Sequence, residues 1–154
     1  MSTLRRLKFE TLDEAAQEAS RLLEFGYVRS GNWSLGQICR HLTLVQNPSI
    51  DGYPFWLSLF APLRPAMRWW LLPKLLDTDS QPRIRTIKAF MPPADSDDSD
   101  DTFEVHNFRR SVDRMLDHTA PFAPHPAFGR VPRQTILQIH AAHAAHHLRF
   151  LQAQ

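Results

Sequence analysis

Apolar residues recur every three or four positions in two stretches of the first third of the chain, which is the spacing of one face of an α-helix. The first stretch predicts a helix over residues 12–25, opened by a Thr-x-x-Glu capping box and ended by Gly26. The second predicts a helix over residues 35–46, which a Ser-x-x-Gln pattern opens. Residues 27–31, between the two, are expected to form a loop.

Two more helical patterns lie in the last third. Acidic residues precede a helix expected over residues 102–118, where they favour the positive end of the helix dipole. The last helix is expected from Pro132 to Gln154, because proline is tolerated in a first turn and no glycine or proline follows. At 100° per residue, Ala145 points away from the stripe expected to face inward. That stripe consists of Ile136, Ile139, His140, His143, His147 and Phe150.

The segment between the second and third helices is rich in aromatic residues and interrupted by prolines. We expect a short helix over residues 65–76 and irregular structure elsewhere, including residues 78–93. Residues 94–101 are an acidic run, expected to be a solvated loop that caps the next helix; a calcium loop is the alternative. The pattern predicts an all-α fold. The expected architecture is a four-helix bundle with an irregular aromatic and Pro-rich insertion between helices 2 and 3, in a single domain of residues 1–154.

Composition narrows the classes of function. The formal net charge is only +2 and no basic block is present, so we expect no nucleic-acid partner. The single cysteine excludes an internal disulfide and, with an N-terminal stretch unlike a secretion signal, indicates a cytoplasmic location. No stretch approaches the ~20 apolar residues of a membrane span.

The aromatic residues of the insertion allow three interpretations. Large apolar side chains are usually buried, so packing in the core or in a homodimer is the first. The second is a binding surface for a partner. The third is contact with a membrane surface, which Arg64, Arg68 and Lys74 would favour. It is the least favoured of the three.

Histidines are the chemical feature of this sequence, and four of the eight lie in the last predicted helix. His143 and His147 are four residues apart, the spacing by which a helix offers two imidazoles to one metal ion. His41 lies on the apolar face of the second helix and is the expected third ligand. Buried imidazoles need partners, so the pattern predicts a divalent metal ion such as Zn, Ni, Fe, Cu or Mn. His140 and His146 are the candidate catalytic residues, expected to orient a ligand or carry a proton.

Three protein ligands leave a coordination position open, as in catalytic metal sites and not in closed structural ones. The remaining histidines are expected at the surface or at helix ends. These are His106, His118 and His125.

Two motifs and a linker resemble those of the DinB-like superfamily, which includes damage-inducible proteins and bacillithiol-transferase relatives. Asn32–Leu42, NWSLGQICRHL, resembles its second-helix motif, and His143–Leu151, HAAHHLRFL, resembles its fourth-helix motif. The linker HPAFG, His125–Gly129, is similar to the segment before that helix, and an uncharacterised branch is the most similar. The resemblance implies a four-helix bundle, often dimeric, with a three-His site for a divalent metal. Its ligands fall on His41, His143 and His147.

The resemblance also implies a chemistry, since characterised relatives include metal-dependent thiol S-transferases and maleylpyruvate isomerases that use mycothiol or glutathione. Where the family usually has Gly-Gln after the His pair, this sequence has Leu148 and Arg149. The first hypothesis is a metal-dependent transferase that joins a low-molecular-weight thiol to a small electrophile. The alternative is a non-enzymatic helical module with a structural or vestigial metal site. It would use its aromatic surface for dimerisation or partner binding.

Overall fold

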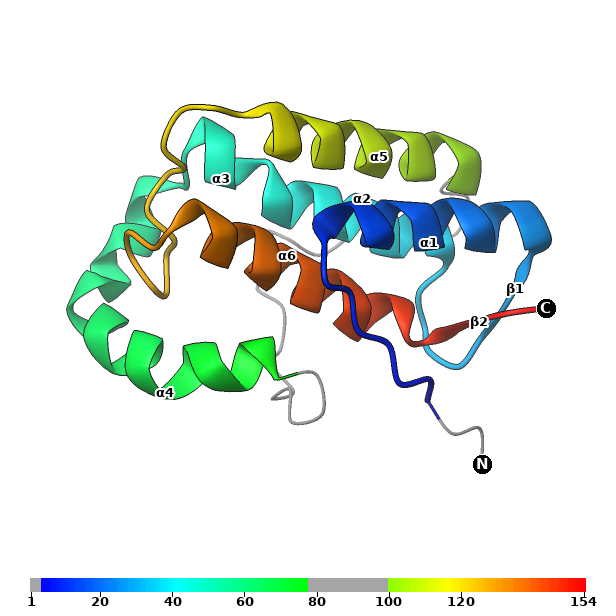
Figure 1. Ribbon diagram of the computed structural model, residues 1–154, viewed down its shortest axis with the longest axis horizontal. Coiled ribbons are helices and arrows are strands. Elements are labelled where there is room, and N and C mark those ends of the chain that lie inside the picture. Colours follow the sequence, from blue (N-terminus) through cyan, green and yellow to red (C-terminus); the bar gives the residue numbers. More distant parts are fainter. Residues whose placement is uncertain (1–3, 78–99) are drawn as a thin grey trace.

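The computed structural model describes residues 4–77 and 100–154, and these residues are mostly helical (Figure 1). The all-α class is confirmed, with a small antiparallel two-stranded sheet added in this part of the chain. In chain order the elements are α1 (Leu12–Phe25), β1 (Tyr27–Arg29), α2 (Leu35–Gln46), α3 (Pro48–Asp51), the 3₁₀ helix η1 (Phe55–Leu63), α4 (Arg64–Leu76), α5 (Asp101–Asp117), α6 (Arg133–Leu148) and β2 (Leu151–Ala153).

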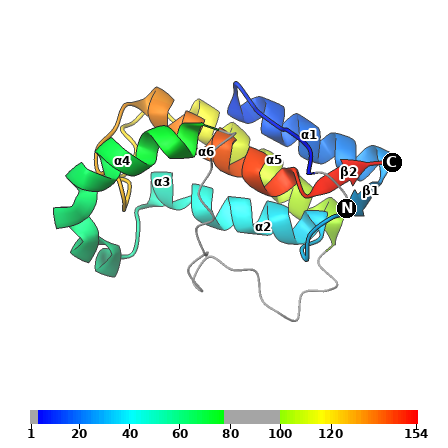
Figure 2. The ribbon, with the colours of Figure 1, turned by 90° about the horizontal axis from the view of Figure 1, so that it is seen from below.

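The core lies among α1, α2, α5 and α6, where α1 and α2 each contact both α5 and α6 (Figure 2). α6 is buried on more than its predicted stripe, because α1, α2 and α4 all contact it. Ala145, expected to face away, is 1% exposed. Alanine carries no side chain beyond Cβ, so the neighbouring helices can approach the α6 backbone closely on several sides.

Side-chain caps fix the starts of the first two long helices, as the sequence predicts. The Oγ1 of Thr11 accepts a hydrogen bond from the backbone N–H of Glu14 (3.3 Å). At α2, Ser34 and Gln37 form a complete capping box, in which each side chain accepts from the other residue's backbone N–H. These bonds satisfy donors that the first turn of a helix otherwise leaves unpaired.

The acidic run before α5 supplies the N-cap of that helix, as predicted. The side chain of Asp100 accepts from the backbone N–H groups of Thr102 and Phe103 (2.9 and 3.3 Å). The rest of this run, residues 94–99, lies outside the described residues, as does the predicted irregular segment 78–93. The calcium alternative therefore stays untested.

The last helix is shorter than predicted, because α6 ends at Leu148 and not at Gln154. The chain then becomes extended as β2, which pairs antiparallel with β1, and β1 replaces part of the loop expected after α1. Nothing in the local sequence stops a helix here. The stop comes from a distant partner, since the backbone N–H of Ser30 donates to the carbonyl oxygen of Phe150 (2.8 Å) next to the strand pair.

The aromatic insertion is helical over most of its described length, so the prediction of an irregular segment is wrong for α3 and η1. α4 matches the predicted short helix to within one residue. Pro48 and Pro65 lie in the first turns of α3 and α4, where a missing N–H leaves no hydrogen bond unmade. Prolines in this segment therefore begin helices as well as interrupting them.

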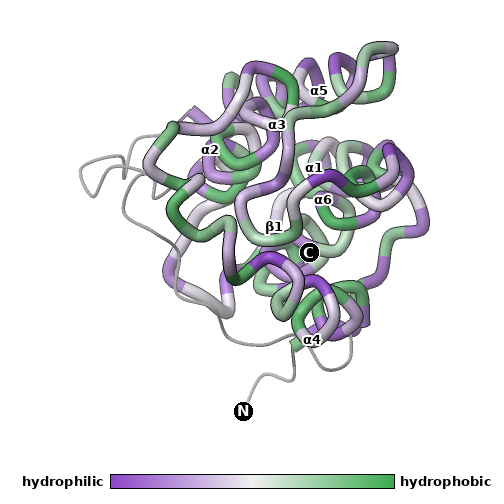
Figure 3. Tube along the Cα trace, turned by 90° about the vertical axis from the view of Figure 1, so that its left-hand side faces the viewer, coloured by the Kyte–Doolittle hydropathy of each residue, from purple (hydrophilic) through white to green (hydrophobic). Residues whose placement is uncertain are grey.

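α4 lies on the side of α6 away from α5 (Figures 1 and 3) and packs Leu71 and Leu75 against the core. Other large side chains of η1 and α4 stay exposed, including Phe55 at 87% and Trp69 at 82%. Burial in the core of this chain is therefore wrong for these two residues. None of the helices in residues 4–77 and 100–154 is both long and apolar enough to cross a bilayer.

Candidate metal centre

Two helices bring three histidines together. His41 lies on the buried face of α2 and is 1% exposed. His143 and His147 lie one turn apart on α6, which packs against α2. One ring nitrogen from each of the three lies within 4.8 Å of the other two, close enough for one metal ion. The three residues predicted as ligands thus form a single cluster, hereafter the triad.

The spacing of the triad nitrogens fits a shared ion. The Nε2 of His143 lies 3.3 Å from that of His41 and 3.0 Å from that of His147. An ion at ~2.0–2.1 Å from each nitrogen, with tetrahedral or octahedral angles, separates its ligand nitrogens by about 2.9–3.4 Å. Both distances fall within that range, and the donor set of three imidazoles suits Zn, Ni and Fe.

Burial keeps the imidazoles of α6 neutral. It lowers the pKa of His143 well below the usual value, and charge on His147 or His41 would lower it further. Burial also lowers the pKa of His147, with positive charge on His41, His146 and Arg149 acting in the same direction. A neutral imidazole keeps a lone pair for a metal, so protons do not compete for these nitrogens near pH 7.

Trp33, in the loop before α2, packs on two of the three rings. Its ring lies nearly parallel to that of His147, with centroids 5.4 Å apart and an interplanar angle of 15°. The ring of His41 is 5.2 Å away and tilted by 55°. A large flat side chain stacked on an imidazole limits its rotation, so Trp33 orients the triad.

His140, one turn before His143, does not join the triad. Its Nε2 makes a hydrogen bond with the Oγ of Ser49 (2.9 Å), which in turn bonds the hydroxyl of Tyr53 (2.8 Å). Burial lowers the pKa of His140 to about 3, and charge on His125 acts in the same direction. His140 is therefore a neutral imidazole held by a hydroxyl, and it joins α6 to α3.

The remaining histidines follow the prediction in part. His106 is exposed, and His118 is the C-cap residue of α5, as expected. His125 is wrongly predicted as a surface or capping residue, because it is partly buried and stacks on Phe128 with centroids 4.6 Å apart. Its Nδ1 accepts from the backbone N–H of Ala127 (3.1 Å). Burial lowers the pKa of His125 to about 4, and the positive charge of Arg64 has a smaller effect in the same direction.

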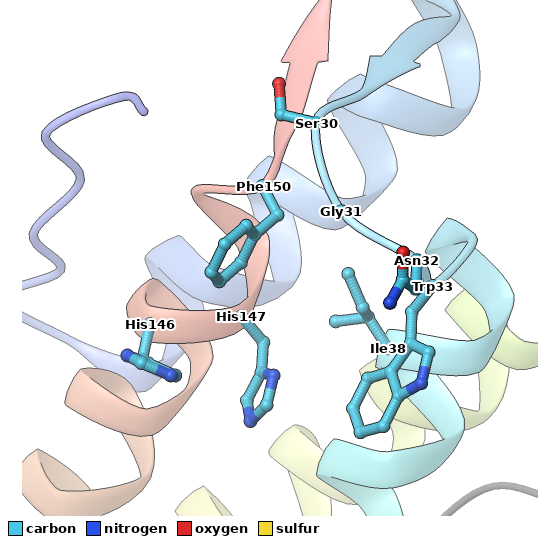
Figure 4. Close-up of a pocket in the computed structure, with 8 residues that line it drawn as sticks. All are labelled: Ser30, Gly31, Asn32, Trp33, Ile38, His146, His147 and Phe150. Carbon is cyan, nitrogen blue, oxygen red and sulfur yellow. The ribbon is translucent and has the colours of Figure 1, made fainter. Parts of the chain in front are cut away.

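A pocket of about 510 Å³ reaches the triad at His147 (Figure 4). His146 also lines it, with its ring centroid 5.1 Å from that of His147. The Nδ1 of His146 is buried and has no hydrogen-bond partner among the described residues. Burial lowers the pKa of His146 to about 4, and the charge of Arg149 lowers it further. Of the two predicted catalytic residues, His146 thus lines the pocket, whereas His140 bonds to Ser49.

The sequence did not identify the other walls of this pocket. Figure 4 shows Trp33 and Phe150 on opposite sides, with Ile38 between them. A Cβ on Gly31 would lie 3.3 Å from Cβ and Cδ1 of Phe150, so the glycine lets the loop meet the ring. The available signal was a glycine and a tryptophan directly before the cap of the helix that carries His41.

One family of known proteins matches this chain. Its description is "Protein of unknown function (DUF1569)", and the match covers residues 1–154. No curated protein and no solved structure matches significantly. The function must therefore be argued from the triad and its pocket. Because the match spans residues 1–154, the chain belongs to the DUF1569 family of proteins of unknown function.

Proposed function

We propose that this protein binds one divalent metal ion through His41, His143 and His147. The observation that carries the proposal is the meeting of three imidazole nitrogens within 4.8 Å of one another, with the Nε2 of His143 3.3 Å from that of His41 and 3.0 Å from that of His147. Two of the rings are kept neutral by burial, which leaves their lone pairs for a cation. Zn, Ni, Fe, Cu and Mn are the candidate ions, and imidazole favours the first four.

We further propose a thiol S-transferase activity at this site. A divalent ion with three protein ligands supplies Lewis acidity, which lowers the pKa of a low-molecular-weight thiol and favours its thiolate. The thiol has to come from outside the chain. Cys39, the single cysteine, is 0% exposed, and burial raises the pKa of its thiol well above the usual value. The small electrophile enters the pocket beside His147.

In this proposal His146 relays the proton that the thiol loses and passes it on, because a pKa of about 4 keeps the ring from holding a proton near pH 7. Its Nδ1 has no partner among the described residues and its ring lines the pocket. His140 is the weaker candidate, because its Nε2 already bonds to Ser49. The thiolate sulfur then forms one bond to the electrophile. In a substitution the leaving group departs with its bonding electron pair, and in an addition the pair stays on the electrophile. In either case that pair takes up the proton that the thiol lost, which balances the reaction.

The arrangement of helices supports a further proposal, that the chain is a four-helix bundle of the DinB-like type. α1, α2, α5 and α6 pack together, with one candidate ligand on the second of these and two on the last. That distribution is the one implied by the resemblance of the two motifs. The absence of a matching solved structure leaves the proposal to experiment.

Elemental analysis of protein purified without an affinity tag tests the metal site. We expect about one equivalent of metal, and its loss in the variant His143→Ala plus His147→Ala. His106→Ala removes an exposed histidine and is the matched control, expected to retain the metal. Unchanged metal content in a folded double variant would refute the proposal. Thiol consumption with a dinitrophenyl halide, measured on the same proteins, tests the transferase activity.

A second candidate function is favoured by the exposed aromatic side chains. Phe55, Trp69 and Trp70 are 87%, 82% and 59% exposed, which is unusual for residues of this size. In this proposal the protein is a non-enzymatic module that uses η1 and α4 to form a homodimer. Light scattering would then show a dimer that Trp69→Asp dissociates, and chelators would leave the melting temperature unchanged. A monomer in both proteins would contradict it.

A further inference from the structure

The pocket beside the triad has two aromatic walls with fixed positions. Phe150 is held from the backbone, since its carbonyl oxygen accepts from Ser30 and β2 continues directly into the strand pair. Its ring touches the loop at Gly31, where an added Cβ would lie 3.3 Å away. On the opposite wall, Trp33 stacks on His147. Figure 4 shows the two rings on opposite sides of the pocket.

The charges at and around this pocket favour a negatively charged ligand. Asn32 and His146 contribute neutral polar side chains, and none of the lining residues described is acidic. The guanidinium of Arg149 lies over Phe150, 5.4 Å from its ring centre, so a positive charge lies against one of the residues that line the pocket. A divalent ion at the triad would add to this positive potential.

From these features we infer that the pocket binds a flat, conjugated molecule with an anionic group. Its ring would pack against Trp33 and Phe150, next to Ile38, and its anionic group would lie toward His147. The inference rests on the proposed function, because it names the class of molecule that the same site takes. Two sources have this chemistry, an aromatic or conjugated thiol and a conjugated carboxylic acid that serves as the electrophile.

Calorimetric titration of the Zn-loaded full chain tests the inference with two pairs of probes. Benzenethiol is compared with cyclohexanethiol, and benzoate with cyclohexanecarboxylate, so that each pair differs in flatness at similar size. The quantity of interest is the preference for the aromatic member. We expect this preference to fall roughly three- to tenfold in Phe150→Leu, as the loss of one ring contact predicts. The ligands also differ in acidity, but that difference is the same for both proteins and cancels.

Phe103→Leu is the matched control, since Phe103 is a 59% exposed ring on α5 outside the pocket. It is expected to leave both preferences unchanged. A fall for the thiol pair in Phe150→Leu assigns the slot to the thiol, and a fall for the acid pair assigns it to the electrophile. Equal preferences in wild type and Phe150→Leu would overturn the inference.

Gly31→Ala provides a second test that removes no ring. Its added methyl would press on Phe150, so the ring must shift and the same preference is expected to change. This variant decides the matter if Phe150→Leu does not fold. Metal content is measured on every sample. Wild type without metal overturns the proposed function. The slot then survives only if benzoate or benzenethiol still binds saturably and Phe150→Leu weakens that binding.

Discussion

Two groups of contacts lie one turn apart on α6, one at the buried His140 and one at the half-buried His143 and His147, and they differ in their partners. His140 bonds a protein hydroxyl, the Oγ of Ser49, and forms part of a chain of hydrogen bonds that ends at Tyr53. The Nε2 of His143 instead lies 3.0 Å from the Nε2 of His147 and 3.3 Å from that of His41. The first group bonds within the fold, and the second lies close enough together to hold a metal ion.

This comparison shows that burial and position on a helix do not identify a ligand. His140 and His143 both lie on the predicted inner stripe of α6, and burial lowers the pKa of both. The group opposite each ring decides its role. A hydroxyl can donate to or accept from a neutral imidazole, whereas three imidazole nitrogens within 4.8 Å of one another can share one metal ion.

Removing the metal should give the largest difference between the two groups, because the melting temperature should depend on the ion at the triad and not on His140. Chelation is expected to lower the melting temperature of the wild type by about 5–15 °C, because a bound ion at a hundred to a thousand times its dissociation constant stabilises by ~2.7–4.1 kcal/mol. His143→Ala should show no such shift. His140→Gln, the control, should keep it even if the variant is less stable. The comparison fails if His140→Gln abolishes the shift and His143→Ala retains it.

Lowering the pH should destabilise the protein at His140, because the fold keeps this imidazole neutral. Burial lowers the pKa of His140 to about 3, so below the unfolded value of ~6.5 the unfolded chain binds a proton that the folded chain does not. In the metal-free protein, His140 therefore does not reduce the free energy of unfolding above about pH 6.5. That free energy falls by about 1.4 kcal/mol per pH unit from this residue as the pH drops toward 3.

Urea unfolding at several pH values measures this effect. His140→Gln should lose that part of the slope between pH 6 and 4, whereas His106→Ala should keep the wild-type slope. His125, with a pKa lowered to about 4, adds to the slope in the same direction. A slope that is identical in wild type and His140→Gln would show that His140 does not stay neutral in the fold.

Ser49→Ala should destabilise the protein without affecting the triad. It leaves the Nε2 of His140 and the hydroxyl of Tyr53 without their shared partner, which is expected to cost about 1–3 kcal/mol of unfolding free energy. Ser58→Ala is the control, since Ser58 is exposed and donates to the carbonyl oxygen of Phe55 within η1. Metal content should be unchanged in both. Loss of metal in Ser49→Ala would mean that the two groups are coupled.

The smallest effect is expected at Trp33, which orients the triad without binding the ion. Trp33→Phe keeps a flat ring near His147 and should change the dissociation constant for Zn by less than about threefold. Trp33→Ala removes the stacking surface and should weaken binding by roughly tenfold. A competition titration with a chromophoric chelator measures both. Equal affinity in all three proteins would show that the ring has no such role.

Much of the fold and the triad can be predicted from local sequence. The bounds of α1 and α2 follow from capping residues and apolar spacing, which act within a few positions of the chain. His143 and His147 are related by one helical turn, and His41 shares the apolar face of α2. Each of these inferences needs only helical geometry and the assumption that apolar faces meet.

The missed features depend on contacts between distant parts of the chain. α6 ends before Phe150 because the chain that follows pairs with β1, and no residue near Phe150 indicates this pairing in the sequence. The pocket needs both Trp33 and Phe150, which come from opposite ends of the sequence. Proline gave the wrong signal in the insertion, since Pro48 begins a helix there. Helical period alone cannot supply any of these three facts.

The alanines around His143 have a consequence for ion selectivity. Four of them are at most 5% exposed, so the α6 backbone lies close against its neighbours. Such a helix cannot slide or swell to suit a larger cation without opening gaps along the core. The ligand nitrogens would therefore impose a narrow range of ionic radii, and the protein would choose its metal by size as well as by affinity. The alanines are Ala141, Ala142, Ala144 and Ala145.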